Sequence, residues 1–228
     1  MFGLGRPARP KAVAFDIIGT VFPLEPLRPS VMALGLPAAG LEGWFAAGCR
    51  DAFAMAAAGD FKPFTTVLEA ALDQVLAEQG LNPPEHDRQA LVKGLGTLDA
   101  RPDAGAAFQT LVSAGIPLLA LSNGARSATQ SLLERAGLAN LVQTIVSVEE
   151  VKLSKPRAEV YEHAAREASV ATGELALVAV HPWDINGAAA AGLVTAYLEA
   201  ERPYSKAMRA PDVTGRTLTE LAERVVHL

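Results

Sequence analysis

The chain opens with a short apolar run that ends at a carboxylate. Residues 11–15 (KAVAF) are apolar after the first position, and Asp16 follows directly. An apolar run of this length, without polar alternation, indicates a strand buried on both faces of a parallel sheet and not an amphipathic helix. Residues 19–29 are rich in Gly and Pro, so we expect the chain to turn there.

Similar apolar runs recur in the second half of the chain, and helical segments separate them. Strands are expected at 116–121, 143–148, 176–180 and 194–198. Helices are expected at 104–114, 127–136, 157–167, 185–191 and 218–226. Strands and helices that alternate at this spacing imply right-handed crossovers between parallel strands. The predicted fold class is therefore α/β, with a Rossmann-like, doubly wound parallel sheet.

The segment between the first two strands has a different texture. Residues 31–98 are rich in Ala and show no strand-like alternation, and the turn formers Gly59, Gly80 and Pro83 interrupt them. This pattern indicates several inserted helices. We therefore expect two domains, a Rossmann-like core formed by residues 1–21 and 100–228 and a helical cap formed by residues 22–99.

Composition narrows the possible partners. Half of the 228 residues are hydrophobic and the net charge is −5, so the chain has no basic stripe for nucleic acid. No apolar run is long enough to cross a bilayer, and residues 1–11 lack the apolar centre of a secretory signal. The single cysteine, Cys49, fits a reducing compartment. We expect a cytoplasmic protein that acts on a small molecule.

Candidate chemistry lies where the strands end, because ligands of open parallel sheets bind beyond the carboxyl ends of the strands. Asp16 follows the first strand, and Gly19 and Thr20 then offer a tight turn and a hydroxyl. A carboxylate held there is an available nucleophile. The alternative is an aspartate that only caps the following turn.

Three further groups follow the same rule. Ser122 and Asn123 end the second strand and could bind an oxyanion, or they could cap the helix expected at 127. Lys155, in a loop before a helix, would keep a nearby carboxylate ionised, unless it is a solvated surface lysine. Asp184 either belongs to the site or caps the helix expected after it.

The segment that carries Asp184 also contains His181 and Trp183. His181 is a candidate base or substrate contact, or simply an oriented polar residue. Trp183 is expected to form part of the pocket wall or to pack against it.

In this order, the motifs FDIIGT, LSNG, KLSKPRAEVY and VAVHPWDINGA resemble those of the haloacid dehalogenase superfamily. The resemblance is greatest to the (S)-specific, type II 2-haloacid dehalogenases and runs from about residue 11 to residue 198. It implies hydrolytic dehalogenation of small 2-haloalkanoic acids. Asp16 would displace the halide and form an aspartyl ester, which water would then hydrolyse.

The resemblance also implies roles for the other residues. Lys155 and Asp184 would tune the nucleophile and help to place the water, with His181 beside them. Thr20, Ser122 and Asn123 would bind carboxylate and oxyanion groups, and Tyr161 would support the site. The resemblance further suggests a homodimer.

One position separates the branches of this superfamily. Phosphatases of the superfamily carry a second aspartate two residues after the nucleophile, where this chain has Ile18. An aliphatic side chain cannot protonate a leaving alcohol, whereas a halide needs no proton to leave. Only Asp16 and Asp184 are obvious ligands for Mg²⁺, which prefers several oxygen ligands. We therefore expect no metal and no cofactor.

Several positions depart from the dehalogenase pattern. Phe45 lies where the family has an arginine that contacts halogen and substrate, and Phe45 cannot donate a charged hydrogen bond. Arg28 or Arg50 could replace that arginine. A family serine is Ala179 and a water-positioning asparagine is His181. Phosphate-ester hydrolysis, or the same fold with an altered or lost activity, are the alternatives to dehalogenation.

Overall fold

The computed structural model describes residues 8–199 and 204–228. Most of the N-terminal stretch discussed above, residues 1–7, lies outside these ranges. The described chain contains a six-stranded sheet in the order β3-β2-β1-β4-β5-β6, and every pairing is parallel. The strands are β1 Ala12–Asp16, β2 Leu118–Ser122, β3 Thr144–Ser147, β4 Leu175–Ala179, β5 Val194–Leu198 and β6 Val213–Gly215. The doubly wound α/β fold class is confirmed.

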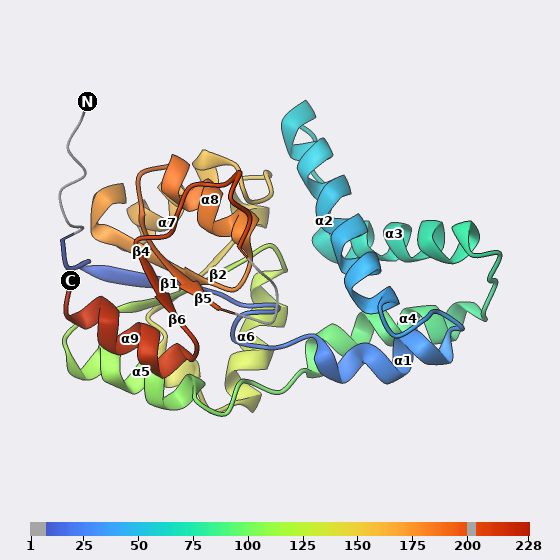
Figure 1. The fold of residues 1–228 in the computed structure, drawn as a ribbon, viewed down its shortest axis with the longest axis horizontal. Helices are drawn as coiled ribbons and strands as arrows, with labels where there is room; N and C mark the ends of the chain where they lie inside the picture. Colours follow the sequence, from blue (N-terminus) through green and yellow to red (C-terminus); the bar gives the residue numbers. More distant parts are fainter. Residues whose placement is uncertain (1–7, 200–203) are drawn as a thin grey trace.

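Helices cover both faces of the sheet (Figure 1). One face is covered by α5 Ala104–Ser113, α6 Arg126–Arg135 and α9 Leu218–Val226, and the other by α7 Ala158–Glu167 and α8 Pro182–Ala190. The central strand β1 alternates between the two cores, since Val13 and Phe15 pack on the first face and Ala12 and Ala14 on the second. A strand buried on both faces explains the continuous apolar run before Asp16.

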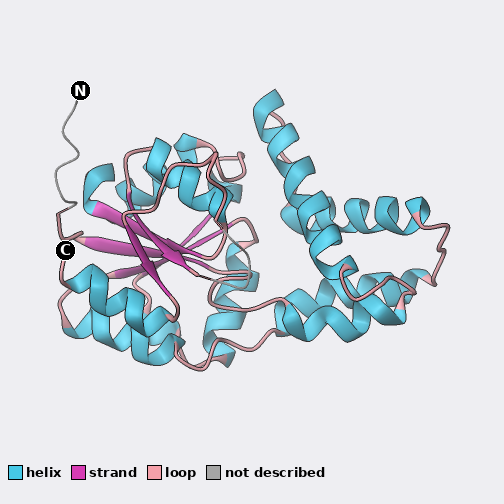
Figure 2. Ribbon diagram, in the orientation of Figure 1, coloured by secondary structure: helices cyan, strands magenta, loops and turns pink. Residues whose placement is uncertain are grey.

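A second group of helices lies beyond the carboxyl ends of the strands, beside the sheet (Figure 2). These are α1 Arg28–Ala33, α2 Gly40–Ala58, α3 Phe64–Glu78 and α4 Glu85–Gly94. Helices α2 and α3 pack closely at Gly48. A Cβ at this position would lie only 2.5 Å from a methyl carbon of Leu68, so the absence of a side chain allows the close approach. The indole of Trp44 donates a hydrogen bond to the carbonyl of Leu68 at 2.8 Å.

Short 3-10 helices connect several of these elements. They are η1 Glu25–Leu27, η2 Leu95–Thr97, η3 Ala139–Leu141, η4 Val148–Glu150 and η5 Thr172–Glu174. The chain leaves the core after β1 through η1 and returns to it through η2.

Two elements differ from the sequence-based expectation. The three-residue strand β6 at the sheet edge was not expected, since it is too short to show a pattern. Helix α8 begins at Pro182, three residues before the expected start at 185. Proline is suited to the first helical turn, because the missing N–H would have no helical partner there. Asp184 is therefore the third residue of the helix and not its cap.

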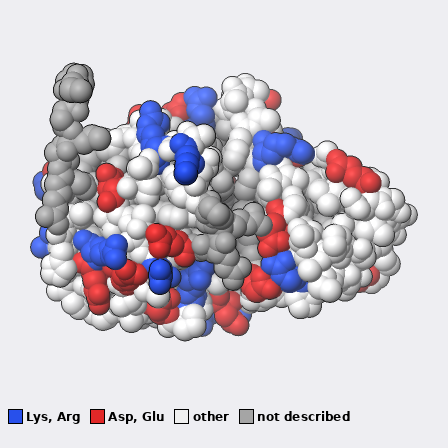
Figure 3. Space-filling model, in the orientation of Figure 1, with Lys and Arg blue, Asp and Glu red and all other residues white. Residues whose placement is uncertain are grey.

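The surface agrees with the mixed charge of the sequence. On the face drawn in Figure 3, Lys and Arg side chains are interspersed with Asp and Glu. Among the helices of residues 8–199 and 204–228, none has both the length and the apolarity needed to cross a membrane.

Candidate active site

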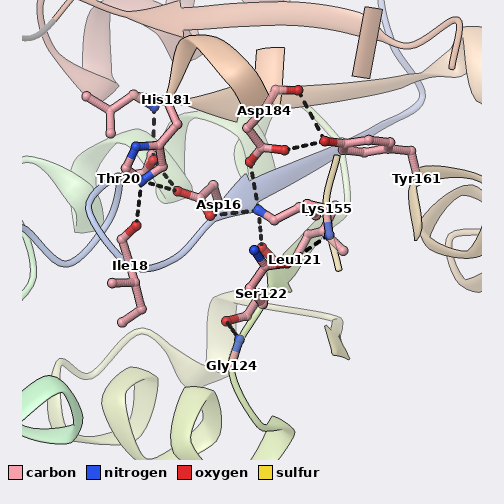
Figure 4. Close-up of polar contacts among 12 residues, drawn as sticks. Asp16, Ile18, Thr20, Leu121, Ser122, Gly124, Lys155, Tyr161, His181 and Asp184 are labelled. Carbon is pink, nitrogen blue, oxygen red and sulfur yellow. Dashed lines mark hydrogen bonds and ion pairs between the residues drawn. The ribbon is translucent and has the colours of Figure 1, made fainter. Parts of the chain in front are cut away.

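The carboxylate of Asp16 lies at the end of β1 and is held by two side chains (Figure 4). The Thr20 hydroxyl donates to Oδ2 at 2.6 Å, and the Lys155 ammonium donates to Oδ1 at 2.7 Å. Asp16 is only 4% exposed. Both oxygens are thus engaged by residues of the site, and the alternative of a simple turn cap is wrong.

The turn after β1 depends on Gly19. Its φ of +89° lies in the left-handed region, which strains any residue with a side chain. A Cβ at this position would also lie 2.6 Å from Nε2 of His181. The turn brings the Thr20 hydroxyl onto Asp16, and that hydroxyl accepts a hydrogen bond from the backbone N–H of Val180 at 3.0 Å.

Lys155 connects the two carboxylates of the site. Its Nζ lies 2.7 Å from Asp16 Oδ1 and 2.7 Å from Asp184 Oδ2, and it donates a third bond to the Leu121 carbonyl at 3.3 Å. The side chain is fully buried, so the alternative of a solvated surface lysine is wrong. Burial alone would lower the pKa of Lys155, but the two carboxylates outweigh it and raise that pKa above its ordinary value.

Asp184 is held from both sides. Lys155 donates to one carboxylate oxygen, and the Tyr161 hydroxyl donates to the other at 2.6 Å. Burial, reinforced by Asp184, raises the pKa of Tyr161 well above its ordinary value, so the phenol remains a donor. Gly187 makes this approach possible, because a Cβ there would lie 2.7 Å from the Tyr161 oxygen. Asp184 faces the site, so the capping alternative for it is wrong.

A small cavity of about 10 Å³ adjoins the nucleophile. This volume accommodates about one water molecule. Its lining residues are Asp16, Ile18, Phe45, Phe64, Ser122, Asn123, Gly124, His181 and Trp183.

The polar side of the cavity is formed by the loop after β2. The Ser122 hydroxyl accepts a hydrogen bond from the Gly124 N–H at 2.9 Å, and the Asn123 side-chain oxygen accepts one from the Lys155 N–H at 3.0 Å. The N-cap of α6 is Ala125, so the proposed capping role of Ser122 and Asn123 is wrong.

The opposite side of the cavity is aromatic. His181 is stacked between Phe45, with ring centroids 5.6 Å apart, and Trp183, with centroids 5.1 Å apart. Phe64 meets Phe45 edge-on at 6.1 Å, and Phe53 lies 5.0 Å from Trp183. Helix α2, the first residue of α3 and the start of α8 therefore build one continuous aromatic wall.

The His181 ring is fixed by a backbone contact. Its Nε2 donates to the Ile18 carbonyl at 2.9 Å, since a carbonyl oxygen can only accept, and lies 3.6 Å from Asp16 Oδ2 (Figure 4). The tautomer with hydrogen on Nε2 follows from this contact.

The structure brings most of the predicted site residues together, with two differences of position. Thr20, expected to bind carboxylate and oxyanion groups, contacts the Asp16 carboxylate, and Tyr161, expected to support the site, contacts that of Asp184. The two arginines considered as replacements at Phe45 are engaged elsewhere. Arg28 pairs with Glu25 and Glu42 and donates to the Ala38 carbonyl, and Arg50 contacts Asp51 and Gln74.

Other contributors were not visible in the sequence. The Val180 N–H and the Arg101 guanidinium both bind the turn after Asp16. Neither contact has a recognisable sequence pattern. A backbone N–H is present at almost every position, and Arg101 occurs in an ordinary polar linker. In residues 8–199 and 204–228, no group of three or more His, Cys, Asp or Glu side chains is arranged to hold a metal ion.

A sequence model of the haloacid dehalogenase-like hydrolases matches residues 10–192, which contain all four motifs quoted above. The chain belongs to this family. The resemblance noted from the motifs is thereby confirmed. Within the family, the (S)-2-haloacid dehalogenase 2 of Pseudomonas sp. (strain CBS-3) is 26% identical over 221 residues, which cover 96% of this chain and 90% of that protein.

Solved structures of the family share the fold. The L-2-haloacid dehalogenase of Xanthobacter autotrophicus with chloropropionic acid covalently bound has a TM-score of 0.84 at 23% identity, covering 94% of this chain and 98% of that one. The L-2-haloacid dehalogenase RSc1362 has a TM-score of 0.88 at 26% identity, covering 96% and 99%.

Proposed function

We propose that this member of the haloacid dehalogenase-like hydrolases is a hydrolytic dehalogenase of small 2-haloalkanoic acids. The observation that carries the proposal is the Asp16 carboxylate, held by Lys155 and Thr20 at the edge of a cavity, with Ile18 in place of a general acid. A halide leaves without a proton, so this arrangement suits displacement at a carbon–halogen bond. The names of the similar dehalogenases support the same reaction.

In the first step, a carboxylate oxygen of Asp16 attacks the carbon that bears the halogen. The new C–O bond forms as the C–X bond breaks, and the halide leaves with the bonding electron pair. The Lys155 ammonium, 2.7 Å from Asp16 Oδ1, holds this carboxylate in position for the attack. Ser122 and Asn123, on the polar side of the cavity, are the residues that we assign to the substrate carboxylate.

In the second step, water attacks the carbonyl carbon of the Asp16 ester. The ester C–O bond breaks, the 2-hydroxy acid leaves and the carboxylate is restored, so one water is consumed and one proton and one halide are released. His181 lines the cavity 3.6 Å from Asp16, and we assign it to holding this water. Asp184 and Tyr161 keep Lys155 in place for both steps.

We further propose that residues 22–99 act as a cap. They contribute Phe45 and Phe64 to the wall above Asp16. The cavity of about 10 Å³ holds about one water and no haloacid, so α2 and α3 must move for substrate to enter. Closing again would exclude bulk water during displacement.

Phe45 favours a second candidate, a member of the same fold with altered substrate recognition. Arg28 and Arg50 are held by other partners. The Lys155 ammonium donates its three hydrogen bonds to Asp16, Asp184 and the Leu121 carbonyl. An anionic substrate would therefore meet few charged donors. Phosphate-ester hydrolysis has less support, because the Lys155 ammonium lies between the two carboxylates that would bind Mg²⁺.

The deciding experiment measures halide release from a panel of 2-haloacids and phosphate release from a panel of phosphate esters. Each is run with EDTA and with added Mg²⁺. We expect halide release that is unchanged by EDTA. Phosphate release that requires Mg²⁺ would replace the proposal with the phosphatase alternative, and saturable binding without turnover would indicate a lost activity. The homodimer and the cytoplasmic location also stay predictions. Analytical sedimentation tests the homodimer.

A further inference from the structure

Four consecutive carbonyls in the turn after the nucleophile accept hydrogen bonds from two residues, His181 and Arg101. His181 donates to the carbonyl of residue 18 at 2.9 Å. The Arg101 guanidinium donates to the carbonyls of residues 19 and 20 at 3.4 and 2.8 Å, and the Arg101 backbone N–H donates to that of residue 21 at 2.8 Å. The turn is thus held between the start of α8 and the linker before α5.

Arg101 is an unusual arginine in this molecule. It is half-buried, and within residues 8–199 and 204–228 it forms no ion pair with a carboxylate. Burial lowers the pKa of Arg101, and the nearby Asp103 offsets this only in part. The carbonyls of residues 19 and 20 therefore take the place of a carboxylate partner, and they fix the guanidinium against the turn.

The bonds of Arg101 reach the nucleophile through a single residue. The Thr20 carbonyl accepts a hydrogen bond from Arg101, and the Thr20 hydroxyl donates one to Asp16 Oδ2 at 2.6 Å. The guanidinium therefore fixes the backbone from which the Thr20 hydroxyl points. Displacement requires the attacking oxygen to be aligned with the C–X bond, and a small misalignment costs a large factor in rate.

Arg101 also lies at the connection between the core and helices α1–α4. The chain leaves the core through residues 17–24 and returns through residues 98–103, and Arg101 links these two segments. We propose that Arg101 is a positioning residue that keeps Thr20 on Asp16 while the α1–α4 helices move to admit substrate. This inference rests on the proposed dehalogenation for its kinetic test, and a second measurement is independent of it.

The kinetic test compares Arg101→Gln with Arg135→Gln. Arg135 is a matched control, because its guanidinium also donates to two backbone carbonyls, those of Gly96 and Thr97, at 3.0 and 3.1 Å, and these lie in η2, directly before the returning segment. We expect Arg101→Gln to lower kcat about ten- to a hundredfold with little change in KM, because alignment and not binding is lost. Arg135→Gln should leave kcat within about twofold. Equal kcat values for the two variants would overturn the proposal.

The second measurement is amide hydrogen exchange of residues 17–22, which needs no substrate. It should be faster in Arg101→Gln than in Arg135→Gln, and equal exchange would also overturn the proposal. If Arg101→Gln does not fold, Arg101→Lys serves instead, since it keeps the charge but cannot span both carbonyls. Its kcat should fall below that of the wild type and of Arg135→Gln, because the charge remains and the alignment is lost. A kcat for Arg101→Lys equal to that of the wild type would therefore contradict positioning by the guanidinium. Absence of halide release from the wild type would refute the proposed dehalogenase activity. The comparison of amide exchange in the two variants would then decide the role of Arg101.

Discussion

The two walls of the cavity are built on different principles. On the sheet side, Asp16 lines the cavity, and directed bonds from several elements engage its carboxylate together with the buried side chains of Lys155 and Asp184. On the side of α2, Phe45 meets its neighbours through ring contacts, edge-on with Phe64 and stacked with His181. Hydrogen bonds fix position and angle closely, whereas stacked rings tolerate a range of distances and offsets.

This contrast separates chemistry from recognition. A substitution on the polar wall leaves a buried donor or charge without its partner, so it affects catalysis and stability together. A substitution on the aromatic wall changes what fits against Asp16 and leaves the nucleophile in place. The polar wall therefore tolerates fewer substitutions, and substrate recognition can diverge through substitutions on the aromatic wall.

The largest effect is expected from Asp16→Asn. An amide is not a nucleophile for displacement, so halide release should fall by about a thousandfold or more. The melting temperature and circular dichroism show whether the fold remains. Asp99→Asn is the control, because Asp99 is a 94% exposed surface aspartate. Near-normal turnover by the Asp16 variant would remove Asp16 from the mechanism.

Lys155→Met should be damaging in a different way. It would leave two carboxylates facing each other in a buried site, and removing one partner of such a cluster costs about 3–5 kcal/mol. We expect a lower urea midpoint together with loss of halide release. The double variant Lys155→Met/Asp184→Asn removes one of those charges and should recover part of the stability without recovering activity. If the single variant is as stable as the wild type, the ion pairs contribute little to folding.

Phe45→Arg tests the aromatic wall. A hydrogen bond to a charged group contributes about 1.5–3 kcal/mol, so the new arginine should raise kcat/KM for 2-chloropropionate about ten- to a hundredfold. Phe45→Met is the neutral control and should bring no such gain. A wild-type enzyme that already turns over short 2-chloro acids quickly, with no gain from arginine, would show that another residue binds the anion.

The smallest effect is expected from Gly19→Ala, which touches both walls. The variant strains the backbone at φ +89° and places a methyl group against the His181 ring. Gly80→Ala is the matched control, because Gly80 has φ +67° and nothing within 4 Å of a new Cβ. Both variants should lose about 1 kcal/mol of stability from strain. Only Gly19→Ala should lower kcat, by about tenfold, and equal kcat values would mean that the His181 position is unimportant.

The sequence predicts the fold and the polar wall better than the aromatic one. Asp16, Ser122 and the segment from His181 follow apolar runs, and the carboxyl ends of parallel strands meet at one edge, so their convergence could be foreseen. The bonds among them could not. The contact of Lys155 with Asp16 spans 139 positions and depends on the loop after β3, which has no periodic pattern.

The aromatic wall and Arg101 were harder to foresee for physical reasons. Phe45 belongs to a helix whose apolar residues mostly pack against other helices, and only the placement of α2 beside the loop before α8 selects the one that meets His181. Arg101 donates to backbone carbonyls, which every residue possesses, so no partner residue marks it in the sequence.

The complete burial of Lys155 has a consequence for the solvent outside. A surface counterion would be screened as salt is added, with a Debye length that shortens to about 3 Å at 1 M. The Lys155 ammonium is 0% exposed, so dissolved ions cannot come between it and the two carboxylates. The nucleophile therefore carries its own internal counterion, and the attraction between Lys155 and Asp16 should be nearly independent of ionic strength. Any inhibition by salt would then report on the entry of the substrate and not on the contact between Lys155 and Asp16.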